Sequence, residues 1–126
     1  MAEQPYDILD DFIKNRSRYI SWSGLANGDT GQPIPIAGHS DKTVHIYGTF
    51  GAGGTVALEG SNDPRVLSDP GNAVWTTMND AQALSLSATS ERIDMVIENP
   101  RFIRPNASAG DGTTDLTVIL CARIIN

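Results

Sequence analysis

The clearest alternation of apolar and polar positions lies between Thr43 and Asp63. Apolar or small residues occupy every second position from Val44 to Phe50, which is the period of a strand with one buried face. Three glycines at positions 51, 53 and 54 then interrupt the run, since glycine adopts backbone angles that other residues avoid. The alternation resumes at Val56, so we predict a β-hairpin whose apolar face is covered by the other strands.

Shorter alternating runs, separated by turns rich in Gly, Asn, Asp and Pro, fill the rest of the chain. In residues 91–98, Ile93, Met95 and Ile97 share one face. The last run has apolar residues on both faces, so we expect each face to be covered, by a second sheet or by a subunit. Besides the hairpin, the predicted strands are 19–25, a short edge strand at 34–36, 74–78, 83–87, 91–98, 101–105 and 115–125. About seven or eight short strands predict an all-β single domain with a β-sandwich or jelly-roll-like fold.

Residues 1–18 differ from the rest, because their apolar residues are spaced as on one face of a helix. Acidic residues come first and basic residues last, which suits the dipole of a helix. We therefore predict an N-terminal arm or short amphipathic helix over 1–18 and a β-sandwich domain over 19–126. A helix this short needs a surface to pack on, and that surface belongs either to its own domain or to a neighbouring molecule.

Charge and composition exclude several classes of function. The 126-residue chain carries a net charge of −6, which argues against nucleic acid as a partner. No apolar stretch approaches the roughly 18–20 residues needed to cross a membrane, and the N-terminus lacks the apolar region of a secretory signal. The single cysteine, Cys121, cannot form an internal disulfide and is expected to pack as a small hydrophobic residue.

The sequence offers the residue types of several reactive sites without their spacing. His39, Ser40 and Asp41 are adjacent, and neighbours in a chain do not generally adopt the geometry of a hydrolytic triad. The stretch Asp111–Asp115 lacks the calcium-binding pattern of an EF-hand, so we expect a tight turn. Two histidines and one cysteine do not suffice for a closed zinc site of the usual kind. We predict no catalytic, cofactor-binding or metal-binding residues, and no enzymatic activity.

Two groups of residues are candidates for binding a partner protein. Arg101 and Arg104 bracket an apolar pair between two prolines, and they bind acidic groups of a partner or pair with local carboxylates. The other group is the apolar set of the N-terminal segment: Tyr6, Ile8, Leu9, Phe12 and Ile13. The aromatic side chains of Trp22, Tyr47 and Trp75 stack on a sugar in one interpretation and pack in the core or an interface in the other.

Several motifs extend over most of the chain: W-S-G-L-A-N-G-D-T-G (22–31), V-H-I-Y-G-T-F-G (44–51), T-V-A-L-E-G-S-N-D (55–63), residues 75–86, E-N-P-R-F-I-R-P (98–105) and G-D-G-T-T-D-L-T-V-I-L (110–120). In these motifs the chain resembles a group of small tailed-phage virion proteins, the capsid decoration (cement) proteins. The resemblance implies a protein on the outside of the phage head whose partner is the major capsid protein. It also implies synthesis in the cytoplasm of the host bacterium. No catalytic residues come with it.

We therefore expect a non-enzymatic virion structural protein that binds the outer capsid and stabilises it. Capsid junctions repeat by symmetry, so a homo-oligomer, either a dimer or a trimer, is the natural unit. One alternative is a glycan- or receptor-binding β-module of a head or tail fibre, which requires exposed aromatic side chains such as Trp22 or Tyr47 around a concave surface. The other alternative is a further tail or baseplate component.

Overall fold

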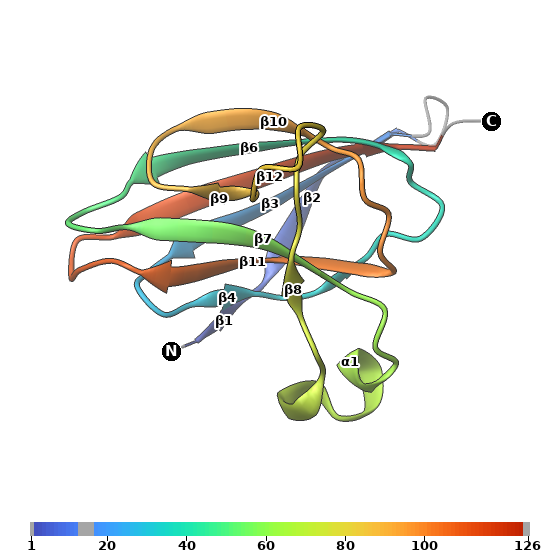
Figure 1. Ribbon diagram of the computed structural model, residues 1–126, viewed down its shortest axis with the longest axis horizontal. Coiled ribbons are helices and arrows are strands. Elements are labelled where there is room, and N and C mark those ends of the chain that lie inside the picture. Colours follow the sequence, from blue (N-terminus) through green and yellow to red (C-terminus); the bar gives the residue numbers. More distant parts are fainter. Residues whose placement is uncertain (1, 13–16, 125–126) are drawn as a thin grey trace.

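Two β-sheets face each other across the core of the protein (Figure 1). The computed structural model describes residues 2–12 and 17–124, and only the backbone of residues 9–12. Short helical turns over Arg65–Ser68 (α1) and Pro70–Asn72 (η1) lie between two strands. The strands are β1 (Glu3–Gln4), β2 (Tyr6–Phe12), β3 (Ser17–Leu25), β4 (Thr30–Gly31), β5 (Ile34–Pro35), β6 (Asp41–Thr49), β7 (Thr55–Ser61), β8 (Thr76–Thr77), β9 (Ser87–Ala88), β10 (Arg92–Val96), β11 (Phe102–Ala109) and β12 (Asp115–Arg123).

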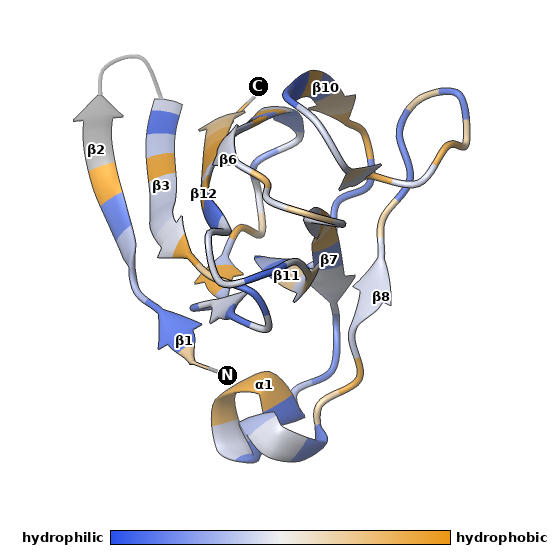
Figure 2. Cartoon of the chain, turned by 90° about the vertical axis from the view of Figure 1, so that its left-hand side faces the viewer, coloured by the Kyte–Doolittle hydropathy of each residue, from blue (hydrophilic) through white to orange (hydrophobic). Residues whose placement is uncertain are grey.

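The predicted all-β, single-domain fold is confirmed. Within the described ranges, sheet A has the order β1-β4-β11-β7-β8, with β5 paired to β11 and β9 paired to β7. Sheet B has the order β10-β6-β12-β3-β2. Figure 2 shows the layers from the side, with β2, β3, β12, β6 and β10 in one layer and β11, β7 and β8 in the other. No helix in this part of the chain has the length and apolar character to span a membrane.

The core lies between the sheets and follows the period of two read from the sequence. Trp22 is fully buried, and its indole N–H donates a hydrogen bond to the Gln32 carbonyl oxygen at 2.9 Å. Every second residue of the long strands points inward, because burying one face of each sheet removes apolar surface from water. The buried side chains of these strands include Ile20, Trp22, Val44, Ile46, Val56, Leu58, Ile103, Leu116, Val118 and Leu120.

The predicted hairpin between β6 and β7 is wrong, although both strands exist. Strand β6 lies in sheet B between β10 and β12, whereas β7 lies in sheet A beside β11. The glycines therefore allow the chain to cross from one sheet to the other. A Cβ atom on Gly54 would overlap the Phe50 carbonyl oxygen, so this crossover requires glycine for close approach of the backbone.

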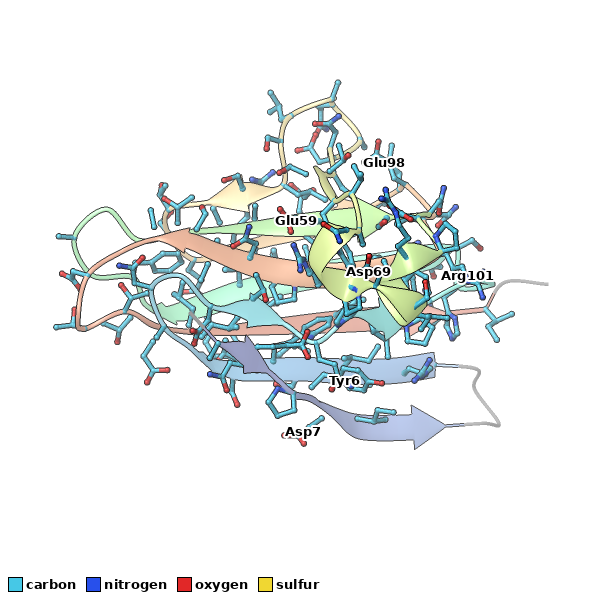
Figure 3. The ribbon with its side chains drawn as sticks, turned by 90° about the horizontal axis from the view of Figure 1, so that it is seen from below. Tyr6, Asp7, Glu59, Asp69, Glu98 and Arg101 are labelled. Carbon is cyan, nitrogen blue, oxygen red and sulfur yellow. The ribbon has the colours of Figure 1, made fainter. Side chains whose placement is uncertain are left out.

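The predicted N-terminal helix is also wrong, because the segment forms strands β1 and β2. Strand β2 pairs antiparallel with β3, so that Tyr6 lies opposite Trp22, and β1 pairs in parallel with β4. The segment thus packs on its own domain. Pairing with the edge of β3 supplies backbone hydrogen bonds that outweigh the helical spacing of a short apolar set. Figure 3 shows Tyr6 directed toward the body of the protein and Asp7 directed away from it.

The buried carboxylate of Asp29 anchors this N-terminal segment. It accepts hydrogen bonds from the backbone N–H of Ala2, the side-chain amide of Gln4 and the backbone N–H of Ala26, each at 3.0 Å. Burial alone would raise the pKa of Asp29, but these hydrogen bonds, led by that from Ala26, lower it below the ordinary value. Asp29 therefore stays ionised and ties β1 to the turn before β4.

Candidate functional site

Strand β10 exposes its apolar side chains instead of burying them. The predicted alternation is correct, but Val96 is the buried residue, whereas Ile93 is 69% and Met95 52% exposed, and Ile97, just after the strand, is 46% exposed. Large apolar side chains grouped on one exposed strand are unusual for a surface with no partner. This row is the feature of the molecule that most clearly indicates a contact with another molecule.

Charged residues on the opposite face of β10 explain its orientation. The guanidinium of Arg92 pairs with the carboxylates of Asp80 at 3.1 Å and Asp94 at 2.7 Å. It also donates hydrogen bonds to the carbonyl oxygens of Ser85 and Ser87. The backbone N–H of Leu84 and the other donors around Asp80 lower the pKa of that buried carboxyl, so it stays ionised beside Arg92. This network holds the polar face of β10 against the loop, and the apolar face is left in water.

The exposed row belongs to a wider surface, the outer face of sheet B. We define this face by the side chains that point away from the core: Tyr19, Ser21, Thr43, His45, Tyr47, Ile93, Met95, Thr117, Ile119 and Cys121, of which Ser21 is itself buried. The register aligns them in rows across four strands. One row is Ile93–His45–Ile119–Ser21, and the next is Met95–Thr43–Cys121–Tyr19.

The second row combines a protruding side chain with a hollow. A hollow of about 210 Å³ is lined by Tyr19, Thr43 and Cys121, and by Ser17, Asp41 and Arg123 at one end. Met95 projects from β10 in the same row. At the margin of the face, the charged groups of Arg123 and Asp41 pair with each other. In the first row, His45 Nε2 lies 3.5 Å from the Glu91 carboxylate.

The members of the predicted partner-binding set whose side chains the structure describes do not gather into one site. Tyr6 packs edge-on against Trp22, with ring centroids 6.2 Å apart, so it adds to the core. Ile8 is 43% exposed on the edge strand of sheet B. The side chains of Leu9 and Phe12, and all of Ile13, fall outside the described residues.

The two arginines of this set have different surroundings. Arg104 is engaged within the domain, because its Nε donates to Glu59 at 2.9 Å and its guanidinium lies 4.2 Å from the centroid of the Trp75 ring. Arg101 is exposed, and its guanidinium lies 5.4 Å from the centroid of the Phe102 ring. Local pairing thus describes Arg104, and Arg101 stays a candidate for contact with a partner.

The His and Asp residues that could have belonged to a reactive site form separate local contacts instead. Asp41 pairs with Arg123, and His39 Nδ1 lies 3.4 Å from the Ala37 carbonyl oxygen. Asp111 forms the expected turn, in which its carboxylate accepts the Thr113 N–H at 2.8 Å. Within residues 2–12 and 17–124, no cluster of three or more His, Cys, Asp or Glu residues has the arrangement of a metal site.

A groove of about 530 Å³ with a mixed polar and apolar lining, which the sequence did not indicate, lies between β8 and the segment before β11. Its lining includes Asn62, Asp63, Asn79, Glu98 and Asn99. Asp63 already pairs with Arg65 at 2.8 Å, and Glu98 accepts the Asn79 N–H at 2.7 Å. The described residues that line the groove include no aromatic side chain on which a sugar could stack.

Comparison with known proteins adds no family. No family model matches the chain, and no curated protein matches it. Among solved structures, the chain is similar to "Crystal Structure of FeII HppE" at 11% identity and a TM-score of 0.44. The match covers 93% of this chain and 48% of that chain, so this chain spans about half the length of its structural neighbour. A similarity this distant says nothing about activity.

Proposed function

We propose that this protein is a non-enzymatic structural component of a tailed-phage virion, specifically a head decoration protein that binds the major capsid protein and stabilises the outer capsid. The exposed apolar row of Ile93, Met95 and Ile97 on a two-sheet body is the observation on which the proposal rests. Such a surface suits a protein that works by docking to other proteins. The motifs that resemble phage virion proteins run through β3, β6, β7, β11 and β12, and they support a phage virion as the assembly to which the protein binds.

Arg101 is our candidate for contact with the head. Its side chain is exposed beside the α1 end of the molecule (Figure 3), and among the described residues it has no carboxylate partner within ion-pair distance. An acidic group of a capsid protein would supply that partner at little desolvation cost. A head presents the same junction many times, so a modest contact of this kind is strengthened when several copies are linked.

The test is co-sedimentation of the purified protein with expanded heads of its own phage that lack it. We expect saturable binding at a fixed ratio to the major capsid protein. Arg101→Gln should bind more weakly, whereas Arg65→Gln should bind like the wild type, because Arg65 already pairs with Asp63. Failure of the folded wild-type protein to bind would contradict the decoration role and would favour a tail position. Undiminished binding of Arg101→Gln would exclude Arg101 from the contact.

A further inference from the structure

The outer face of sheet B has the properties of a surface that meets a copy of itself. An isologous contact requires each copy to carry both halves of a complementary pair, because the same patch serves both subunits. Met95 and the hollow over Cys121 lie in one row of this face, and the hollow begins at Thr43, directly beside Met95. A two-fold rotation therefore allows Met95 of each copy to enter the hollow of the other.

The charge of the face also favours a second copy as the partner. The chain carries a net charge of −6, so two copies repel each other unless they meet through neutral surface. The two central rows over β10, β6, β12 and β3 contain no Asp, Glu, Lys or Arg, and Asp41 and Arg123 at one end of the hollow pair with each other. Asp7 on β2 stands beyond the end of the first row, at the edge strand, and can remain in water.

The size of the face sets the strength to be expected. Three strands about 30 Å long and the shorter β10, about 17 Å long, lie about 4.8 Å apart and cover roughly 510 Å² in each copy. Two such faces bury about 1,000 Å² in total, at the lower limit for a specific interface. We therefore expect an association in the micromolar range, which concentration will shift.

We propose that the outer face of sheet B binds the same face of a second copy and forms a two-fold dimer. Sheet B then becomes the inner layer of a four-layer particle, with Ile93, Met95 and Ile119 withdrawn from water. Arg101 precedes β11 in sheet A, the other layer, and stays available to the head. The dimer uses the exposed side chains of Ile93 and Met95, which also support the proposed function. It is measured on the protein alone, so its failure can be told apart from a failure of head binding.

Sedimentation velocity over a range of about 1 to about 500 μM tests the dimer, since a micromolar dissociation constant falls within it. The mass of the wild type should rise from 13.5 kDa toward twice that value. Ile93→Glu and Met95→Glu, each alone, should weaken association by at least about tenfold, because each places a charge in a desolvated contact. Leu67→Glu is the matched control, since Leu67 is 70% exposed but lies on α1, away from β10 (Figure 1).

A wild-type protein that stays monomeric throughout this range would overturn the proposal. Association that both β10 variants leave unchanged, or that continues beyond two chains, would overturn it as well. Circular dichroism and thermal unfolding of each variant establish that it is folded, so a loss of association can be assigned to the surface.

The single cysteine gives a second, independent measurement. Cys121 is partly exposed on the proposed contact surface. Its reaction with a maleimide should slow as the protein concentration rises and the dimer forms, and Met95→Glu should remove this dependence. A mass that doubles while the reaction rate of Cys121 stays constant would place the contact elsewhere and contradict the proposal.

Discussion

The carboxylate of Asp111 accepts a hydrogen bond from the backbone N–H of Ala52 at 2.8 Å. Ala52 lies in the link that crosses from β6 in sheet B to β7 in sheet A, and Asp111 lies in the link that crosses back from β11 to β12. The Thr114 hydroxyl adds a second bond between the links, to the Phe50 carbonyl oxygen at 2.8 Å. The two crossovers therefore hold one end of the sandwich closed.

Removal of the Asp111 carboxylate should make the stability of the fold less dependent on pH in the acid range. The N–H groups of Ala52 and Thr113, with the Thr113 hydroxyl, lower the pKa of Asp111 to about 2 from 3.8. A carboxyl whose pKa is lower in the folded than in the unfolded state stabilises the fold at pH values above the unfolded-state pKa. This contribution is lost as the pH falls through the folded-state pKa. Asp111→Ala should therefore melt below the wild type near neutral pH, and the gap should close toward about pH 2.

Thermal melts of both proteins across the acid range measure this effect. Asp115→Ala, at the exposed start of β12, is the control, because its side chain takes no part in the hydrogen bonds between the two links, and it should melt close to the wild type near neutral pH. A gap between Asp111→Ala and wild type that persists at the lowest pH would show that the carboxylate charge is not what matters.

Substitution of Gly54 should be far more damaging than substitution of another glycine in these crossovers. A Cβ atom at Gly54 would meet the carbonyl of Phe50, whereas one at Gly112 meets no atom within 4 Å. Gly54→Ala should cost about 2–3 kcal/mol of unfolding free energy through forced displacement of the backbone. Gly112→Ala should stay within about 0.5 kcal/mol, as is usual for surface changes. Denaturant unfolding compares the two, and equal stabilities would contradict the close approach.

The N-terminal strands should loosen when Asp29 loses its carboxylate. Asp29→Ala leaves the donors of Ala2, Gln4 and Ala26 without their acceptor, which should cost about 1–3 kcal/mol. Amide hydrogen exchange should accelerate at Thr30 and Gln32, whose N–H groups bond to this segment. Asp69→Ala serves as the control, since Asp69 is exposed. Unchanged exchange at both amides would show that Asp29 is not the anchor.

Arg104 should contribute to stability and to the environment of Trp75 without contributing to head binding. Arg104→Met removes the ion pair with Glu59 and the cation over the indole ring, for an expected cost of about 1 kcal/mol. Tryptophan fluorescence should change, because Trp75 loses this cover, while Trp22 stays buried. Co-sedimentation with heads should match the wild type. A loss of head binding in folded Arg104→Met would contradict this prediction and would show that Arg104 contributes to the contact with the head.

The alternation of residue types predicted most strands and which residues share a face, but not which face the fold covers. In β10 the polar face turns inward, because Arg92 finds Asp80 on a loop that is distant in sequence. In β6 the buried face of Val44 and Ile46 also takes Lys42, whose amine donates to the side-chain oxygen of Asn99, far away along the chain. Such pairings depend on tertiary neighbours and leave no periodic signal in the chain.

The two errors along the chain have a similar cause. The glycine-rich break after Phe50 looks local in sequence, yet its conformation is imposed by a turn some sixty residues later, through Asp111 and Thr114. The N-terminal segment looks helical in isolation, and only the free edge of β3 makes a strand preferable. The candidate contact surface could not be predicted for the same reason, since the exposed side of β10 is a consequence of the Arg92 network.

The order of strands in sheet B has a consequence for the timing of biosynthesis. Strand β12 is the central strand, hydrogen-bonded to β3 on one side and to β6 on the other, and a ribosome makes it after every other described strand. A nascent chain therefore holds β3 and β6 without their shared neighbour until translation has passed residue 123. Sheet B, and any surface built on it, is thus completed only when translation has reached the end of β12. Partly made copies therefore have no finished outer face through which to associate prematurely.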